Sequence, residues 1–253
     1  MDDDELKRLA EEDFFVGYLP MSGAQKRFGW TVAVAAVLVV LAGGVAAAFF
    51  QRSPGEDLSP YRTGAALDGL LVARPYPMLR TRDEDGAIRH VLLVTGAKQV
   101  WRPPAERVGH GVHLRGNLLE RGGSRMLEVF GNGATEVEGI AALEAVEAEP
   151  LGEVTLRGEI VDSKCYFGRM RPGGGRTHRA CAQLCVAGGI PPVLVTRGPD
   201  GETHYLLASE AGDGVAAEVL PFVAEPVRVR GFLERVGSDL RVLRIDPSEI
   251  ERL

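Results

Sequence analysis

An uninterrupted apolar run near the N-terminus limits what this chain can fold into more than any other feature. From Phe28 to Phe50 the sequence reads FGWTVAVAAVLVVLAGGVAAAFF, 23 residues without one charged side chain. At about 1.5 Å per residue, a helix of this length covers the roughly 30 Å hydrocarbon core of a bilayer. We therefore predict a transmembrane helix over residues 28–50.

The charges on either side of this run predict its orientation. Lys26 and Arg27 precede it directly, whereas Arg52 on the far side is soon followed by acidic residues. Because basic residues favour the cytoplasmic side, we expect a single-pass protein of the cytoplasmic membrane, with its N-terminus inside and its C-terminal part extracytoplasmic, or periplasmic. A cleaved signal peptide is the alternative, since three alanines stand at residues 46–48, although signal peptides rarely have so long an apolar stretch or an acidic leader.

The composition as a whole is that of an ordinary globular protein. The chain has 253 residues, a formal net charge of −6 and 45% hydrophobic residues. This length allows about two domains. Binding to nucleic acid requires clustered Lys and Arg, so the acidic balance leads us to expect no nucleic-acid partner.

Beyond the apolar run, the sequence consists mostly of short β-type segments. A polar stretch with two prolines, QRSPGEDLSP at residues 51–60, is typical of an extended linker. After it, HVLLVTG (90–96), GVHLRGNLLERGG (111–123) and SRMLEVFG (124–131) alternate or run apolar between turn signals. This pattern predicts hairpins and a mainly β protein.

The two halves of this β region repeat one pattern. VHLRGNLLERGGSRMLEV (112–129) matches VRVRGFLERVGSDLRVL (227–243) in the order strand, Arg-Gly, strand, turn, strand. HVLLVTG and HYLLAS precede them at similar positions. Two small five-stranded barrels explain this repeat better than one large sandwich, and a glycine-bent strand followed by a hairpin resembles the OB-fold.

The predicted fold class is therefore mainly β. An N-terminal transmembrane helix is followed by two small OB-like β-barrels, and the second barrel carries a short helix with Cys and His. The boundaries we expect are a cytoplasmic tail at residues 1–27, the transmembrane helix at 28–50, a linker at 51–62, a first OB-like domain at 63–136, a linker or short helix at 137–150 and a second OB-like domain at 151–253.

All three cysteines of the chain lie in one stretch of 21 residues, which belongs to the predicted second barrel. In DSKCYFGRMRPGGGRTHRACAQLC, Cys165 follows a predicted strand, and a short predicted helix carries His178, Cys181 and Cys185. Positions i, i+3 and i+7 share one helix face. A flexible glycine-rich loop allows the strand to deliver Cys165 to that face.

Three thiolates and one imidazole are an established tetrahedral zinc donor set. We predict a metal site formed by Cys165, His178, Cys181 and Cys185, with zinc as the first expectation and an iron–sulfur cluster or copper as alternatives. Four protein ligands leave no open position for a substrate, so we do not expect an enzyme. Four further residues are expected around the ligands, where basic groups would offset thiolate charge: Asp162, Lys164, Tyr166 and Arg179.

The extracytoplasmic location leaves two other interpretations open. Cysteines outside the cytoplasm usually pair, and three of them would give one disulfide, joining Cys165 to Cys181 or Cys185, plus one spare thiol. Alternatively all three remain reduced. In a thiol–disulfide oxidoreductase, Cys181 near the helix start would then be the activated thiol.

The cysteine segment resembles a family of uncharacterised bacterial proteins that are membrane-anchored and extracytoplasmic. Their shared pattern is G-x-[IV]-V-D-x-x-C-Y, then H-x-x-C-A-x-x-C, then G-[IL]-P. The matching positions here are Gly158, Ile160, Val161, Asp162, Cys165, Tyr166, His178, Cys181, Ala182, Cys185, Gly189, Ile190 and Pro191. The leader with DFFVGYLP is similar to the same group. Such proteins accompany membrane-bound respiratory or oxidoreductase gene sets, so the resemblance implies an accessory or redox-partner role beside other membrane-protein subunits.

Overall fold

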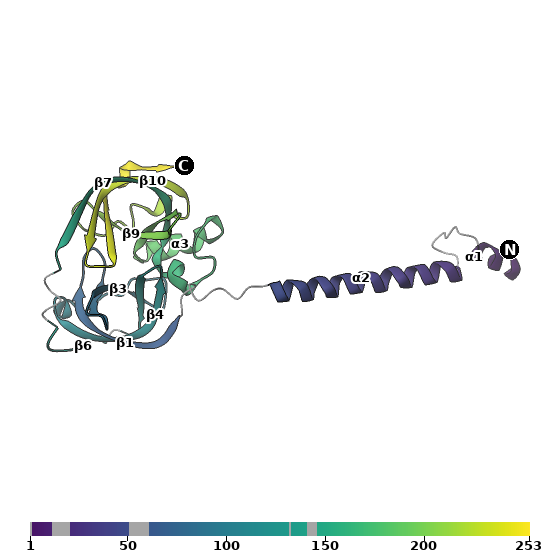
Figure 1. Ribbon diagram of the computed structural model, residues 1–253, viewed down its shortest axis with the longest axis horizontal. Coiled ribbons are helices and arrows are strands. Elements are labelled where there is room, and N and C mark those ends of the chain that lie inside the picture. The colour runs from purple at the N-terminus through teal and green to yellow at the C-terminus, as the bar shows by residue number, and fades with distance from the viewer. Residues whose placement is uncertain (1, 12–20, 51–60, 132, 141–145) are drawn as a thin grey trace. The chain divides into compact units, whose positions relative to one another are not determined.

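The structure is a computed structural model that describes residues 2–11, 21–50, 61–131, 133–140 and 146–253. It divides into two compact units, Met1–Gly55 and Glu56–Leu253 (Figure 1). Most of the predicted linker at 51–62, the DFFVGYLP segment and the middle of the predicted linker at 137–150 lie outside the described residues.

The N-terminal unit contains two helices, α1 (Asp3–Glu11) and α2 (Gly23–Phe50). The α2 helix includes the whole apolar run and begins five residues before it, because Ser22 and Gln25 form a capping box. The Ser22 hydroxyl accepts from the Gln25 N–H at 3.2 Å, and the Gln25 side chain accepts from the Ser22 N–H at 3.0 Å. No described side chain of α2 is buried. By length and composition, the helix could be a membrane span or a signal sequence.

The first barrel is formed by β1 to β5. The strands and short helix of this half are β1 (Arg62–Val72), β2 (Met78–Arg82), β3 (Ile88–Thr95), η1 (Ala105–Arg107), β4 (Gly111–Arg121), β5 (Ser124–Val129) and β6 (Thr135–Glu136). The sheet order is β1-β2-β3-β5-β4, and β4 pairs back with β1, so the five strands close into a barrel. The β3–β5 pairing is parallel and the others are antiparallel.

The second barrel, formed by β7 to β11, repeats these pairings strand for strand. Its elements are β7 (Ala148–Asp162), η3 (Cys165–Arg169), η4 (Arg176–His178), α3 (Arg179–Ala187), β8 (Pro192–Gly198), β9 (Gly201–Ser209), η5 (Leu220–Phe222), β10 (Pro226–Val236), β11 (Leu240–Ile245), η6 (Pro247–Glu249) and β12 (Ile250–Arg252). The order is β7-β8-β9-β11-β10, β10 returns to β7, and β9–β11 is the parallel pair. The predicted fold class is confirmed: a mainly β chain with an N-terminal apolar helix, two OB-like barrels and a short Cys/His helix.

The first strand of each barrel bends at a glycine. In β1 the pairing passes from β4 to β2 next to Gly69, and in β7 it passes from β10 to β8 next to Gly158. A Cβ at either position would lie 2.3 Å from a backbone oxygen of the neighbouring strand, that of Arg80 or Val195. Only glycine allows such a close approach, which is why one strand can serve both sides of a small barrel.

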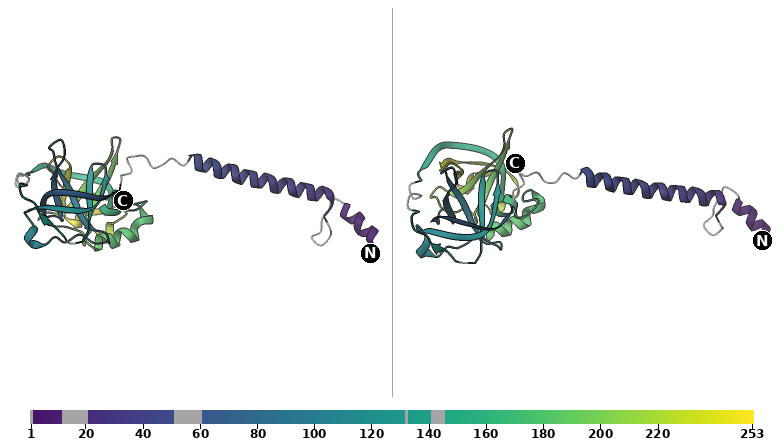
Figure 2. Two further views of the ribbon diagram at one scale, coloured as in Figure 1. Left: turned by 90° about the horizontal axis from the view of Figure 1, so that it is seen from below. Right: turned by 60° about the horizontal axis from the view of Figure 1, so that its bottom comes forward.

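An apolar core joins the two barrels within the second unit. It contains buried side chains from both halves, among them Met78, Leu92, Val94, Leu119 and Met126 from the first barrel and Val161, Phe167, Val193, Val195 and Leu206 from the second. The helix α3 lies at the side of the barrels in both views of Figure 2. Its Cys185 and the neighbouring Cys165 belong to the same core, so the cysteine segment is packed where the two barrels meet.

Two polar contacts cross this interface reciprocally. His90, on the third strand of the first barrel, binds the hairpin turn of the second: its N–H and Nδ1 lie 2.8 and 2.9 Å from the Asp239 carboxylate. The equivalent His204 of the second barrel binds the hairpin turn of the first, with Nδ1 2.9 Å from the Ser124 hydroxyl. Such mutual contacts between equivalent positions are the pattern of a two-fold interface, so the sequence repeat is also a repeat of packing.

Replacing Asp239 with alanine should destabilise the second unit. The His90 side chain is only 2% exposed, and the substitution would remove the acceptor of both its N–H and its ring. Leaving buried donors without an acceptor costs on the order of 3 kcal/mol, which corresponds to a midpoint about 6–12 °C lower for a unit of this size. Thermal unfolding of the full chain in detergent, followed by near-ultraviolet circular dichroism, measures the effect. Asp200→Ala, in an exposed turn, is the control, and an equal loss in both variants would contradict the prediction.

Candidate metal centre

The site begins where the first strand of the second barrel ends. After β7 ends at Asp162, the chain turns directly into η3, whose first residue is Cys165. The Asp162 carboxylate accepts a hydrogen bond from the Cys165 N–H at 2.8 Å, the local side-chain contact by which aspartate stabilises such a turn. Both residues are buried. Cys165 thus lies just past the strand, as the sequence predicts.

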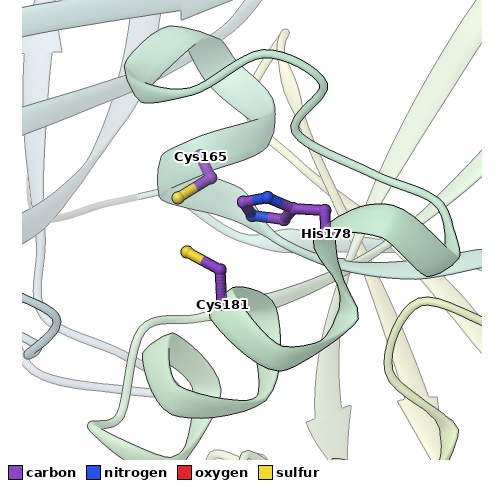
Figure 3. Close-up of side chains that lie close together, drawn as sticks. All are labelled: Cys165, His178 and Cys181. Atoms are coloured by element: carbon purple, nitrogen blue, oxygen red, sulfur yellow. The ribbon is translucent and has the colours of Figure 1, made fainter.

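The other side of the site is the start of α3. His178 ends η4 and is the N-cap residue of α3, so it stands at the junction of two helices rather than inside one. Cys181 lies in the first turn of α3 and Cys185 in the last turn. In Figure 3 the sulfurs of Cys165 and Cys181 point toward each other, with the His178 ring beside them.

The ligand atoms fall into two overlapping groups of three. Cys165, His178 and Cys181 form one group, and Asp162, Cys165 and Cys185 form the other; within each, the atoms lie within 4.8 Å of one another. Two sulfurs bound to one zinc ion at about 2.3 Å are at most about 4.6 Å apart, so small shifts suffice to bring either group onto one ion. The cluster could therefore hold a metal. Among the described residues, the four predicted ligands do not form a single group at this spacing.

Asp162 orients the histidine of the site. Its Oδ2 lies 3.0 Å from His178 Nε2, and both side chains are almost completely buried. A metal-bound histidine commonly has its second ring nitrogen held by a carboxylate. With Nε2 engaged by Asp162, Nδ1 is the ring nitrogen left for an ion. The sequence predicts Asp162 near the ligands, and the structure adds this specific contact.

A lysine from the first barrel brings a positive charge to the site. Lys98, in the loop after β3, has its Nζ 2.7 Å from Cys181 Sγ and 3.8 Å from Cys185 Sγ. The hydrogen bond to Cys181 and the nearby thiolates raise the pKa of Lys98 above its ordinary value, against a smaller opposite effect of burial. Sequence analysis does not find Lys98, because it belongs to the other barrel and no local signal connects it with the cysteine motif.

The two buried thiols differ in how readily they ionise. A hydrogen bond between Cys165 and Cys185, together with burial, raises the pKa of Cys165 and keeps its proton in place. The same hydrogen bond, helped by the charge of Lys98, lowers the pKa of Cys185 despite its burial. All three cysteines are free thiols in the structure. Because metals bind thiolates, binding at Cys165 must release its proton.

Lys164 forms hydrogen bonds with the loop that contains Lys98. Its Nζ donates to the backbone oxygens of Thr95 and Ala97 at 2.8 and 2.6 Å, and lies 3.0 Å from a carboxylate oxygen of the buried Glu128. All three partners are in the first barrel. The ammonium group of Lys164 therefore contacts the first barrel and not the sulfurs. It positions the loop whose Lys98 does contact them.

The two remaining predicted neighbours point to other partners. The Tyr166 hydroxyl donates to Glu202 at 2.8 Å, and burial is the main reason why the pKa of Tyr166 rises to about 12. Arg179 pairs with Glu225. Both residues flank the ligands in sequence, but the polar atoms of their side chains engage side chains of the second barrel.

Comparison with protein-family models and with curated proteins found no match to this chain. The interpretation of the site therefore rests on its geometry and on the chemistry of its donors.

Replacing Lys164 with methionine should destabilise the second unit by about 3–5 kcal/mol, because it leaves the Glu128 carboxylate buried without its closest cation. The double variant Lys164→Met/Glu128→Leu should recover most of this loss, since removing both charges is often neutral. Arg169→Met is the matched control. Arg169 pairs with the same carboxylate at 3.3 Å but is 43% exposed, so its loss should cost about 1 kcal/mol or less. Chemical denaturation of the full chain measures all three, and a double variant as unstable as Lys164→Met would contradict the assignment.

Proposed function

We propose that this chain is a membrane-anchored, extracytoplasmic metal-binding module that serves a membrane oxidoreductase or respiratory assembly as an accessory subunit. The observation that carries the proposal is the cluster itself, in which ligand atoms of Cys165, His178 and Cys181 lie within 4.8 Å of one another. Two thiols, an imidazole and a carboxylate that orients the imidazole are a donor set suited to zinc or to a redox metal.

A metal at this position joins parts of the fold that the chain connects only through a glycine-rich loop. Cys165 is the first residue of η3, just past the end of β7, and His178 and Cys181 lie at the start of α3. Three glycines lie between them: Gly173, Gly174 and Gly175. One ion would hold strand and helix together, as structural zinc does. Lys98, close to two sulfurs, offsets the negative charge that thiolate ligands bring.

Membrane anchoring is supported by α2 and by the charges that flank it. The helix is long and apolar enough to cross a bilayer, and Lys26 and Arg27 near its start favour a cytoplasmic N-terminus. The resemblance of the cysteine segment to membrane-anchored extracytoplasmic proteins agrees with this orientation. Both barrels then lie outside the cytoplasm, where a partner membrane protein could bind them.

Metal analysis tests the proposal directly. The full chain, made in a bacterial host with its native leader and purified in detergent without chelators, should carry about one metal ion per chain, as expected for one closed site. His178→Ala should remove this metal, because the ring is a ligand. His110→Ala, at a histidine with an exposed side chain in the first barrel, should retain it. Wild-type protein without metal, with one free thiol and one disulfide, would contradict the proposal.

A reporter fusion tests the orientation. Alkaline phosphatase joined after Leu253 should be active, because this enzyme matures only outside the cytoplasm. The same reporter joined directly after Arg27, before the apolar run, should be inactive. Equal activity of both fusions would contradict the orientation. Release of the barrels from the membrane by cleavage near residues 46–48 would favour a signal peptide over an anchor.

Thiol–disulfide exchange is a second candidate function, and one observation favours it. Cys181 is half-buried, accepts a hydrogen bond from Lys98, and has Cys165 as a neighbouring thiol. Oxidation of these two thiols to a disulfide would pass two electrons and two protons to the disulfide of a partner protein. His178→Ala separates the two functions, since it removes a metal ligand but leaves both sulfurs available for exchange.

A further inference from the structure

A thioether contacts the cluster although it lies outside the Cys/His motif. Met170 directly follows η3, and its Sδ is 3.7 Å from Cys181 Sγ. The residue is 47% exposed, so it is not part of the apolar core. The cluster thus has two sulfur neighbours beyond Cys165, His178 and Cys181: the thiol of Cys185 on the buried side and the thioether of Met170 on the open side.

The nature of the fourth donor distinguishes one metal from another. Zinc sites in proteins use thiolate, imidazole and carboxylate, which Cys185 or Asp162 could supply. Thioether sulfur is absent from this zinc set, whereas it is a soft donor that suits copper(I) and occurs as a ligand in copper sites. A set of two thiolates, one imidazole and the Met170 thioether therefore points to copper(I) rather than to zinc.

Two of the three sulfur donors lie on the accessible side. Met170 is exposed and Cys181 half-buried, whereas Cys165 and His178 are buried. Met170 also lines a cavity of about 520 Å³ beside η3 and the glycine-rich loop. An ion can thus reach Met170 and Cys181 from solvent and pass inward to the buried donors, an arrangement suited to loading and releasing a metal.

We propose that the cluster is an exchangeable copper(I) site in which Met170 is a ligand beside Cys165, Cys181 and His178. This inference rests on the proposed metal-binding function and names its metal. Cys185 has a different part here: it is needed for a zinc site of three thiolates and a histidine, but not for the copper(I) site.

Competition titrations of the full chain in detergent test this inference. Copper(I) is titrated anaerobically against a copper(I)-specific chromophoric chelator, and zinc against a zinc indicator. Met170→Leu should lower the copper(I) affinity about 10-fold or more while leaving the zinc affinity unchanged. Cys185→Ser should do the reverse. Met21→Leu, an equally conservative change at an exposed methionine outside the barrels, is the control for both titrations.

The outcomes separate the inference from the function on which it rests. Opposite effects of Met170→Leu and Cys185→Ser on the two metals would support the copper(I) site, and unchanged zinc binding shows that Met170→Leu is folded. If zinc binds but Met170→Leu leaves copper(I) affinity unchanged, or lowers both affinities equally, this inference is overturned and the metal-binding function stands. If neither metal binds more tightly to wild type than to Cys165→Ser, both are overturned.

Discussion

The ammonium group of Lys164 connects the two barrels of this protein beside the candidate metal centre. Lys164 immediately precedes Cys165 in sequence, yet its Nζ reaches into the first barrel, to Glu128 and to the loop after β3. That loop in turn brings Lys98 to the sulfurs. A buried lysine needs both an anion and hydrogen-bond acceptors, and here the first barrel supplies all of them, so the site depends on how the barrels pack.

The second barrel differs from the first mainly by an insertion that holds the candidate centre. The first two strands of the first barrel are connected by residues 73–77, whereas residues 163–191 connect the equivalent strands of the second. η3, η4 and α3 lie in this longer connection, in which η3 packs against β4 and β5 of the first barrel and α3 packs mainly against the second. The rest of the barrel keeps its pairing order, because the insertion begins and ends at the same end of the sheet.

The parts that sequence predicts well are those with a local signal. The charge-free run predicts α2, and the alternation of apolar and polar residues between turn residues predicts the strands. The spacing of Cys181 and Cys185 predicts that both lie on one helix. The position of His178 at the N-cap is a local detail that spacing alone leaves open. Lys98, Glu128 and Met170 are different, because their relation to the cysteines depends on tertiary packing or on the course of a loop. The periodicity of apolar residues in the sequence does not indicate which loop of one barrel will contact a strand end of the other.

The reciprocal histidine contacts have a consequence for how the protein matures. Because the chain is synthesised from its N-terminus, the first barrel can fold before the second is complete. Until then, His90 has no Asp239 to bind, and the apolar face around Leu92 and Met126 has no partner to cover it. The partly synthesised molecule therefore presents an apolar surface to its surroundings, and chaperones that shield such surfaces would have a defined period in which to act.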